Sequence, residues 1–148
     1  MTNILIICQY NHSVSKMAAA YLASKLDAKE YVVADAGMSV HKGDRIADGA
    51  VAALAAKNIR TESMGCNSIS LKDIKQADLI LCSNAEIVKK LTDSFHSARG
   101  KTLHLMTYAN EKRDVFEPRK NVDSHMQCLN MMIPGLNAIA AKLNNACD

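Results

Sequence analysis

Cys8 is the residue of this sequence best suited to chemistry, because it ends an apolar run and opens a short polar loop, residues 8–15 (CQYNHSVS). A loop of this length that leads into a helix turns several backbone N–H groups inward, and the helix dipole adds positive potential. Such a loop binds an anion and favours the thiolate form of its cysteine. Ser15 is placed to cap the helix and to hydrogen-bond the sulfur. The pattern predicts a nucleophilic Cys8 in an anion-binding loop; the alternative is an inert buried cysteine beside a capping serine.

The rest of the composition argues against several other kinds of site. The chain has 148 residues, a net charge of +3 and no dense cluster of Lys and Arg, so we expect no nucleic-acid partner. No apolar run approaches the roughly 18 residues that indicate a membrane span, so we expect no membrane partner. The five cysteines are irregularly spaced and include no C-x-x-C pair, which indicates neither a zinc site nor a disulfide framework. We therefore expect no metal, no cofactor and a reducing cytoplasmic location.

Strand and helix patterns alternate along the chain and would position the loop. Short apolar runs predict buried strands at residues 3–8, 31–36, 77–82 and 101–107. Helix formers and apolar residues at helical spacing predict helices at residues 16–26, 45–59, 71–76 and 85–92. After an irregular loop over residues 108–120, a long amphipathic helix is expected from Val122 to Leu143, and Pro134 should kink or divide it.

This alternation predicts one domain, residues 1–148, of the α/β class. Four strands with right-handed crossovers would form a central four-stranded parallel sheet covered on both faces, which is a three-layer α/β/α sandwich. In open sheets of this kind the binding crevice lies at the carboxyl ends of the strands. Residues 8–15 follow the first strand, so we expect them at that crevice.

Several motifs in order along the chain resemble those of the low-molecular-weight protein tyrosine phosphatases. The loop C-x-x-N-x-x-x-S, followed by KMAAA, resembles the family's C-x-G-N-x-C-R-S-P-M-A-E-A. Further matches are DAG at residues 35–37 for S-A-G, AVAAL at 50–54 for A-V-x-x-L, KNI at 57–59 for K-G-I, and ADLIL at 77–81 for A-D-L-I-L. Glu117-Pro118 stands where the family has its Asp-Pro loop. The resemblance covers essentially the whole chain and implies the phosphotyrosine protein phosphatase I-like fold.

The resemblance also implies a reaction. In the family the loop cysteine attacks the phosphorus of phosphotyrosine and forms a phospho-cysteine, while the aspartate of the Asp-Pro loop protonates the leaving phenol and then activates water. Cys8 matches the nucleophile, Asn11 the asparagine that shapes the loop, and Ser15 the serine that stabilises the thiolate. Glu117 matches the general acid with one extra methylene; the alternative is a solvated loop carboxylate. The implied partner is a phosphorylated protein or a small phosphomonoester, held by a phosphate-binding loop of Gln9, Tyr10, Asn11, His12, Ser13 and Val14.

Four departures from the family's pattern affect the loop, the residue that follows it and the residue after Glu117-Pro118. Val14 stands where the family has the loop arginine, so the bidentate clamp on two phosphoryl oxygens is missing. By analogy with other charge-stabilising donors, this loss costs roughly 10²–10⁵ in rate. Tyr10 replaces the loop glycine, Lys16 the proline after the serine, and Arg119 the aromatic residue after Asp-Pro. Lys16 and Arg119 are candidate compensating cations; the alternative is that both are ordinary surface cations.

Four functions are compatible with these residues. The first is a phosphomonoester hydrolase with weak or lost activity, and the second is a non-catalytic pseudophosphatase that binds an anion or a protein partner in the same crevice. Sugar-transport phosphocarrier domains also have a cysteine and a serine-bearing loop without arginine, but they are shorter and would not need residues 117–118. Arsenate reduction uses this fold with a relay of thiols, yet no second cysteine closely follows Cys82 at the third strand. We expect a phosphatase-fold protein whose hydrolase activity is weak or absent.

Overall fold

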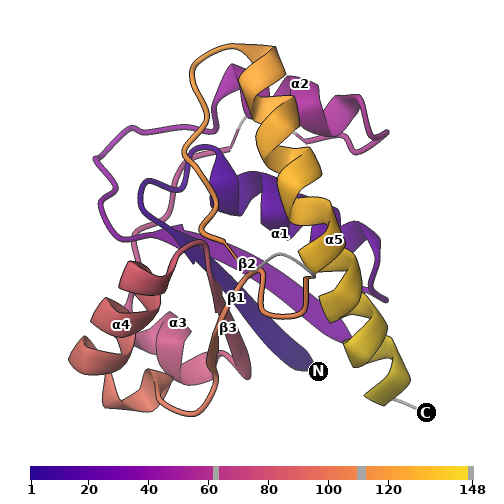
Figure 1. The fold of residues 1–148 in the computed structure, drawn as a ribbon. Helices are drawn as coiled ribbons and strands as arrows, with labels where there is room; N and C mark the ends of the chain where they lie inside the picture. The colour runs from indigo at the N-terminus through magenta and orange to yellow at the C-terminus, as the bar shows by residue number, and fades with distance from the viewer. Residues whose placement is uncertain (62–63, 110–112, 147–148) are drawn as a thin grey trace.

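A four-stranded parallel sheet forms the centre of the computed structural model, which describes residues 1–61, 64–109 and 113–146 (Figure 1). The strands are β1 (Thr2–Cys8), β2 (Tyr31–Gly37), β3 (Leu79–Cys82) and β4 (Thr102–His104), and their order in the sheet is β2-β1-β3-β4. β1 pairs with both β2 and β3, and its Ile7 lies opposite Ala36 on one side and Cys82 on the other. The sheet confirms the fold class that the alternating apolar runs predict.

Helices cover both faces of the sheet. They are α1 (Val14–Ser24), α2 (Asp48–Ala55), α3 (Leu71–Gln76), α4 (Ala85–Ser94) and α5 (Val122–Ala146), with a short 3₁₀ helix η1 at His96–Ala98. α1, α2 and α5 pack on one face in the larger hydrophobic core, and α3 and α4 pack on the other (Figure 1). Alternate residues of β1 contribute to the two cores, because successive side chains of a strand point to opposite faces. Cys8 therefore lies on the same face as α1, α2 and α5.

Most of the predicted elements are present, but several of their boundaries differ. The helix expected at residues 45–59 is shorter as α2, because the backbone N–H of Ala47 donates to His12 O at 2.8 Å and so belongs to a contact between loops. The strand expected at residues 101–107 ends at His104, where the Thr107 N–H closes a turn onto His104 O. The strand expected at residues 77–82 begins at Leu79 as β3. Just before it, the backbone N–H of Asp78 donates a hydrogen bond to Asn3 O.

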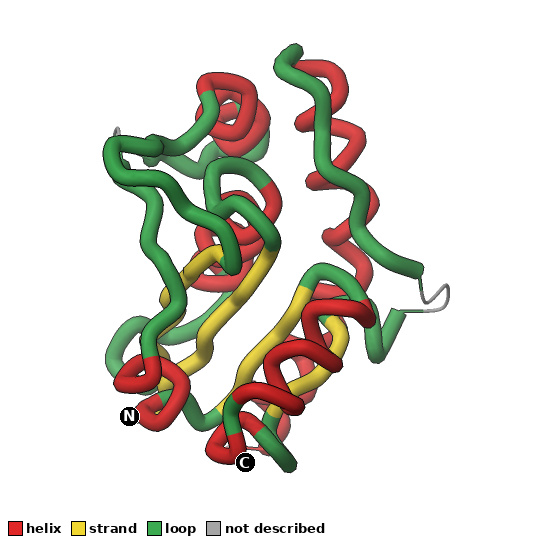
Figure 2. The backbone as a smooth tube through the Cα atoms, turned by 90° about the vertical axis from the view of Figure 1, so that its left-hand side faces the viewer, coloured by secondary structure: helices red, strands yellow, loops and turns green. Residues whose placement is uncertain are grey.

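Pro134, which is expected to kink or divide the C-terminal helix, does not divide it. α5 is one helix of 25 residues that contains Pro134, and this residue is exposed. The next residue, Gly135, is buried, and a Cβ at its position would lie 3.0 Å from Leu105 O, so the helix approaches the β4 end closely there. The segment 113–121 runs beside α5 in the opposite direction (Figure 2). Residues 110–112 of the predicted loop lie outside the described part of the chain.

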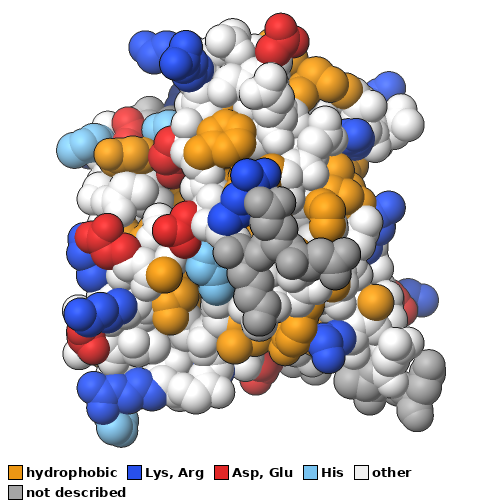
Figure 3. All heavy atoms as spheres, viewed as in Figure 1, with side chains coloured by type: hydrophobic (Ala, Val, Ile, Leu, Met, Phe, Trp, Pro, Cys, Tyr) orange, Lys and Arg blue, Asp and Glu red, His pale blue; other side chains and the backbone are white. Residues whose placement is uncertain are grey.

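Charged side chains are distributed over the molecular surface. On the face shown in Figure 3, Lys and Arg side chains are spread over the surface and do not gather in one patch. Among the residues that the structure describes, no helix combines the length and the apolar character needed to cross a membrane.

Candidate active site

The loop after β1 curls around the sulfur of Cys8. The backbone N–H groups of Asn11 and Ser15 donate to Cys8 Sγ at 3.2 and 3.4 Å. The Ser15 hydroxyl oxygen lies 2.9 Å from the same sulfur, and α1 begins at Val14, so its first turn faces the loop. The predicted contact between Ser15 and the sulfur is present, but Ser15 lies inside α1 and is not its N-cap, which is Ser13. Backbone N–H groups that converge at a helix N-terminus are the geometry of an anion-binding loop.

Asn11 holds the shape of this loop. Its backbone is in the left-handed region, with φ of 64°, a conformation that asparagine tolerates better than most residues. Its side-chain amide donates to Ser15 Oγ at 2.7 Å and to Asp35 Oδ1 at 2.9 Å. Its side-chain oxygen Oδ1 accepts a hydrogen bond from the backbone N–H of Asn67 at 2.7 Å. Asn11 therefore joins the loop to α1, to β2 and to the segment after α2.

Cys8 differs from the expectation that its thiolate would be favoured. Its side chain is fully buried, and this burial raises the pKa of the thiol above its ordinary value. The hydrogen bonds from Ser15 and Asn11 lower the pKa, but they do not offset the loss of hydration, and the charge of Glu117 raises it further. Burial therefore favours the neutral thiol over the thiolate in the free protein. The sequence reveals the donors around the sulfur but not the depth at which it lies.

Glu117 lies close enough to the loop for its charge to act on Cys8. The residue is exposed at the surface, yet protein atoms around its carboxyl group reduce its hydration and raise its pKa. A carboxyl group with a raised pKa keeps its proton to higher pH and can donate it to a leaving oxygen. This placement is compatible with the role of general acid that the family resemblance implies.

Three other loop residues take different positions. Val14 is fully buried in the larger core, so its side chain is part of the packing of α1. Tyr10 is 43% exposed and stacks on His12 with 5.6 Å between the ring centroids. Gln9 donates from Nε2 to Ser39 Oγ at 2.8 Å, which fixes the start of the loop to the segment after β2.

The two candidate compensating cations are also in different environments. Lys16 is only 2% exposed, and its ammonium group forms an ion pair with Asp35 Oδ1 at 2.8 Å. This carboxylate oxygen also accepts the amide of Asn11, so Lys16 supports the loop through Asp35. Arg119 is exposed, and it lines a cavity of about 430 Å³ together with Glu117. Lys16 is thus a structural cation, in contrast to the surface position that the alternative interpretation assigned to it.

Sequence reasoning missed a buried histidine that contacts the loop. The Ser13 hydroxyl lies 2.8 Å from Nε2 of His125 on α5, and His125 Nδ1 lies 2.8 Å from Asn121 O. Ser13 does not cap α1 with its side chain. Sequence reasoning also gave no site role to Asp35 or Asn67. Lys16 and Asp35 replace the proline and the serine of two family motifs, and this joint change to opposite charges could have indicated their ion pair. No comparable pattern in the sequence marks His125.

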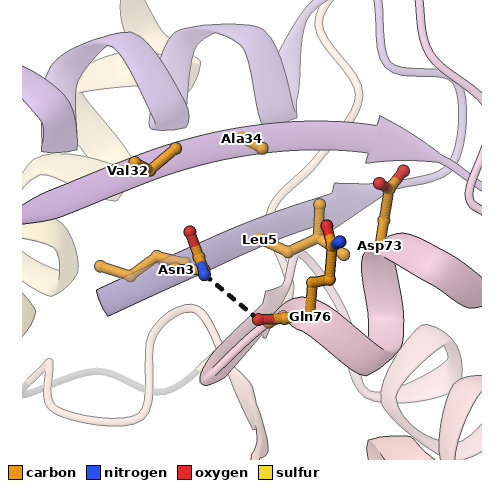
Figure 4. A pocket seen from close by; sticks show the side chains of 8 residues that line it. Asn3, Leu5, Val32, Ala34, Asp73 and Gln76 are labelled. Atoms are coloured by element: carbon orange, nitrogen blue, oxygen red, sulfur yellow. Dashed lines mark hydrogen bonds between the residues drawn. The ribbon is translucent and has the colours of Figure 1, made fainter. Parts of the chain in front are cut away.

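Two cavities are relevant to the choice of site. One of about 320 Å³ opens beside the loop and is lined by His12, Ser13, Arg45, Asp48, Lys120 and His125, among others. The other, of about 130 Å³, lies between the starts of β1 and β2 and α3 (Figure 4). It is away from the carboxyl ends of the strands and contains no loop residue. In the part of the chain that is described, no group of His, Cys, Asp and Glu is arranged to hold a metal ion.

The family model described as low molecular weight phosphotyrosine protein phosphatase matches residues 3–148. The chain belongs to this family. In this phosphatase-family chain, Cys8 occupies the position of the phosphate-loop cysteine, at the end of β1 and below the first turn of α1. The expected low-molecular-weight phosphatase resemblance is therefore confirmed at the level of family and fold. No curated protein matches the sequence.

Solved structures of this family share the fold. A YwlE mutant from Bacillus subtilis superposes with a TM-score of 0.87 at 24% identity, over 97% of this chain and 99% of that one. The YwlE arginine phosphatase from Geobacillus stearothermophilus gives 0.87 at 22% identity, over 99% and 95%. Vibrio vulnificus Wzb, in complex with benzylphosphonate, gives 0.86 at 23% identity, over 95% and 98%. Likeness at these identities describes the phosphatase fold and no particular substrate.

Proposed function

We propose that this protein binds the phosphoryl group of a phosphorylated protein or small phosphomonoester in the loop of residues 8–15, and hydrolyses it slowly through Cys8. The observation that carries the proposal is that backbone donors of the loop converge on the sulfur of Cys8. The N–H groups of Asn11 and Ser15 lie 3.2 and 3.4 Å from Cys8 Sγ. The family to which the chain belongs supports it. Asn11, bonded to three elements, keeps these donors in place before a ligand arrives.

The proposed reaction has two steps. The Cys8 thiol first loses its proton to solvent water. Its sulfur then attacks phosphorus, the S–P bond forms, and the bond to the leaving oxygen breaks. Glu117 gives its proton to that oxygen. Water then attacks phosphorus and loses a proton to Glu117, the S–P bond breaks, and inorganic phosphate leaves. The Ser15 hydroxyl, 2.9 Å from the sulfur, stabilises the departing thiolate.

Two features make this reaction slow. Val14 provides no guanidinium to the phosphoryl oxygens, which removes a donor whose loss costs roughly 10²–10⁵ in rate in comparable sites. Burial raises the pKa of Cys8, so only a small fraction of molecules carry the reactive thiolate at neutral pH. The same features favour a second candidate function, a pseudophosphatase that binds the anion without cleaving it. A neutral thiol does not repel a bound dianion.

Hydrolysis of an aryl phosphate tests the proposal. We expect slow turnover by the unmodified protein and none by Cys8→Ser. Val14→Arg should increase the rate by about 10²-fold or more, because it restores the bidentate donor. Val14→Met, which adds length without charge, is the matched control and should not accelerate the reaction. Thermal unfolding of each variant shows whether the change at this buried position preserves the fold.

The outcomes separate the candidates. Turnover that Cys8→Ser abolishes supports the hydrolase. No turnover together with binding of inorganic phosphate, measured by calorimetry, supports the non-catalytic binder. An unmodified protein that neither turns over the ester nor binds phosphate would overturn both.

A further inference from the structure

A chain of polar contacts crosses from the phosphate loop to α5. Ser13 Oγ lies 2.8 Å from His125 Nε2, and His125 Nδ1 lies 2.8 Å from the backbone oxygen of Asn121. Ser13 and His125 are 2% and 1% exposed. Both ring nitrogens of a buried histidine thus have partners, one of them a loop residue beside the arginine position now held by Val14.

The first turn of α2 leaves space for this histidine. Gly49 is buried, and any Cβ at its position would overlap the His125 ring. The ring is therefore fixed between α2 and the loop and has little freedom to turn away from Ser13. A fixed ring with two short polar contacts is a built feature of the fold and not a surface side chain that happens to reach the loop.

The partners determine how the protons are arranged. A backbone oxygen only accepts hydrogen bonds, so His125 Nδ1 carries a proton and donates it to Asn121 O. In the neutral imidazole, Nε2 then accepts the proton of the Ser13 hydroxyl. In the imidazolium, Nε2 donates, Ser13 Oγ accepts, and the serine hydrogen is released for another acceptor. His12 Nδ1, at 3.3 Å, is placed to accept that hydrogen. An anion bound in the loop would be a second acceptor.

Other charged groups surround His125 and influence its proton. The cavity that contains the ring is also lined by His12 from the loop, Arg45 and Asp48 from the segment around the start of α2, and Lys120 from the segment before α5. The positive charges of Arg45 and Lys120 disfavour the imidazolium form of His125, whereas the negative charge of Asp48 favours it. Histidine is the side chain that ordinarily gains a charge between pH 8 and 5.

We propose that His125 is a positioning residue of the phosphate loop and that its imidazolium form, acting through Ser13, supplies part of the positive charge that the loop lacks at Val14. This inference rests on the proposed anion binding by residues 8–15. Protonation of His125 frees the Ser13 hydroxyl hydrogen to donate to the anion and brings a cation next to the loop, so anion affinity rises as the pH falls. The protonated His125 on α5 thus takes over part of the role that the guanidinium of an arginine would have at the position of Val14.

Sulfate is the probe for the test, because it remains a dianion throughout pH 5.5–8.0, unlike phosphate. Binding is measured by calorimetry at several pH values in Glu117→Gln protein, which removes the titration of that carboxyl group. We expect the affinity to rise about tenfold between pH 8.0 and 5.5, as for one added charge near a partly buried anion. His125→Gln keeps a hydrogen-bonding group near Ser13 without the charge and should remove most of this rise. His96→Gln, at an exposed histidine of η1 on the other face of the sheet, is the matched control and should keep it.

A second measurement needs no substitution at His125. Linkage requires that an anion which binds the imidazolium more tightly also raises the pH at which His125 titrates. The ring proton of His125, followed by NMR in the unmodified protein, should therefore titrate at higher pH with sulfate than without it.

Each result decides a different point. Sulfate binding with the same pH response in His125→Gln as in the Glu117→Gln protein alone would overturn the role of His125 and leave the proposed anion site in place. An unchanged His125 titration in saturating sulfate would do the same. Absence of sulfate binding at every pH would instead contradict the proposed function itself.

Discussion

Asn11 combines a left-handed backbone with a side chain that hydrogen-bonds to three partners and so holds the loop in place. Asn58, after α2, has almost the same φ, 62° against 64°, but it is exposed. The two residues therefore separate the role of the backbone conformation from that of the amide. Glycine tolerates this φ at both sites.

We expect Asn11→Gly to lower the free energy of unfolding by about 2–4 kcal/mol, because buried partners on Ser15, Asp35 and Asn67 lose their hydrogen bonds. The matched Asn58→Gly should change it by less than about 0.5 kcal/mol. Urea unfolding of the two variants measures the difference. Equal effects would mean that the amide of Asn11 contributes little to the loop.

At the scale of the elements, the ion pair between Lys16 and Asp35 joins α1 to β2 behind the loop. The Lys16 side chain is 2% exposed and that of Asp35 is 15% exposed. Asp35 also accepts a hydrogen bond from the amide of Asn11, whereas the ammonium group of Lys16 forms its ion pair with Asp35. Removal of Lys16 therefore leaves Asp35 with a hydrogen-bond partner, whereas removal of the Asp35 carboxylate leaves the buried Lys16 without its ion pair.

This asymmetry predicts unequal effects of removing each partner. Asp35→Asn should cost about 3 kcal/mol of unfolding free energy, because it leaves a buried ammonium group without its carboxylate. Lys16→Met should cost less, since its side chain packs well and Asp35 keeps Asn11 and some water. Lys16→Met added to Asp35→Asn should recover stability, as measured by chemical denaturation. A double variant that is less stable than Asp35→Asn alone would show that Lys16 contributes more than its charge.

The cores on the two faces of the sheet bury thiols as well as apolar side chains. Burial raises the pKa of Cys82 and of Cys128 to about 12, from an ordinary value of 9.0. The unfolded chain loses these protons near pH 9, while the folded protein keeps them. Unfolding therefore releases protons in this range, and the whole molecule loses stability as the pH rises above about 9.

We expect each of these two thiols to contribute a fall of up to about 1.4 kcal/mol per pH unit between pH 9 and 12. Cys128→Ala should make the unfolding free energy less dependent on pH in this range, although it lowers stability at every pH. Cys66→Ala is the matched control, because Cys66 is only half-buried and its removal should change the slope less. Urea unfolding from pH 8 to 10.5 under reducing conditions measures the slopes. An identical slope for Cys128→Ala would contradict the burial of a protonated thiol.

The sequence predicts the fold well for a specific reason. Buried parallel strands read as continuous apolar runs such as residues 3–8, and these runs depend little on distant contacts. Boundaries are predicted less well because they depend on contacts between segments, as at Ala47, whose N–H is bound by His12 O. Pro134 shows the same limit, since a proline is tolerated in α5 where it faces outward.

The site is predictable only in part. The spacing of Cys8, Asn11 and Ser15 fixes which groups meet, and their contacts are those expected from the loop. The contact between Ser13 and His125 joins residues 112 positions apart, and no local pattern marks it. The protonation of Cys8 depends on burial by several elements, which the loop sequence does not contain.

β1 begins and α5 ends at the same end of the molecule, and the phosphate loop lies at the opposite end of β1 (Figure 1). Additional polypeptide joined at either end would therefore extend away from the loop. The protein can be anchored to a sensor surface through both ends at once, with the anion site facing the solution. Such double anchoring would restrain β1 and α5 together, so ligand binding could be followed on molecules held in a single orientation.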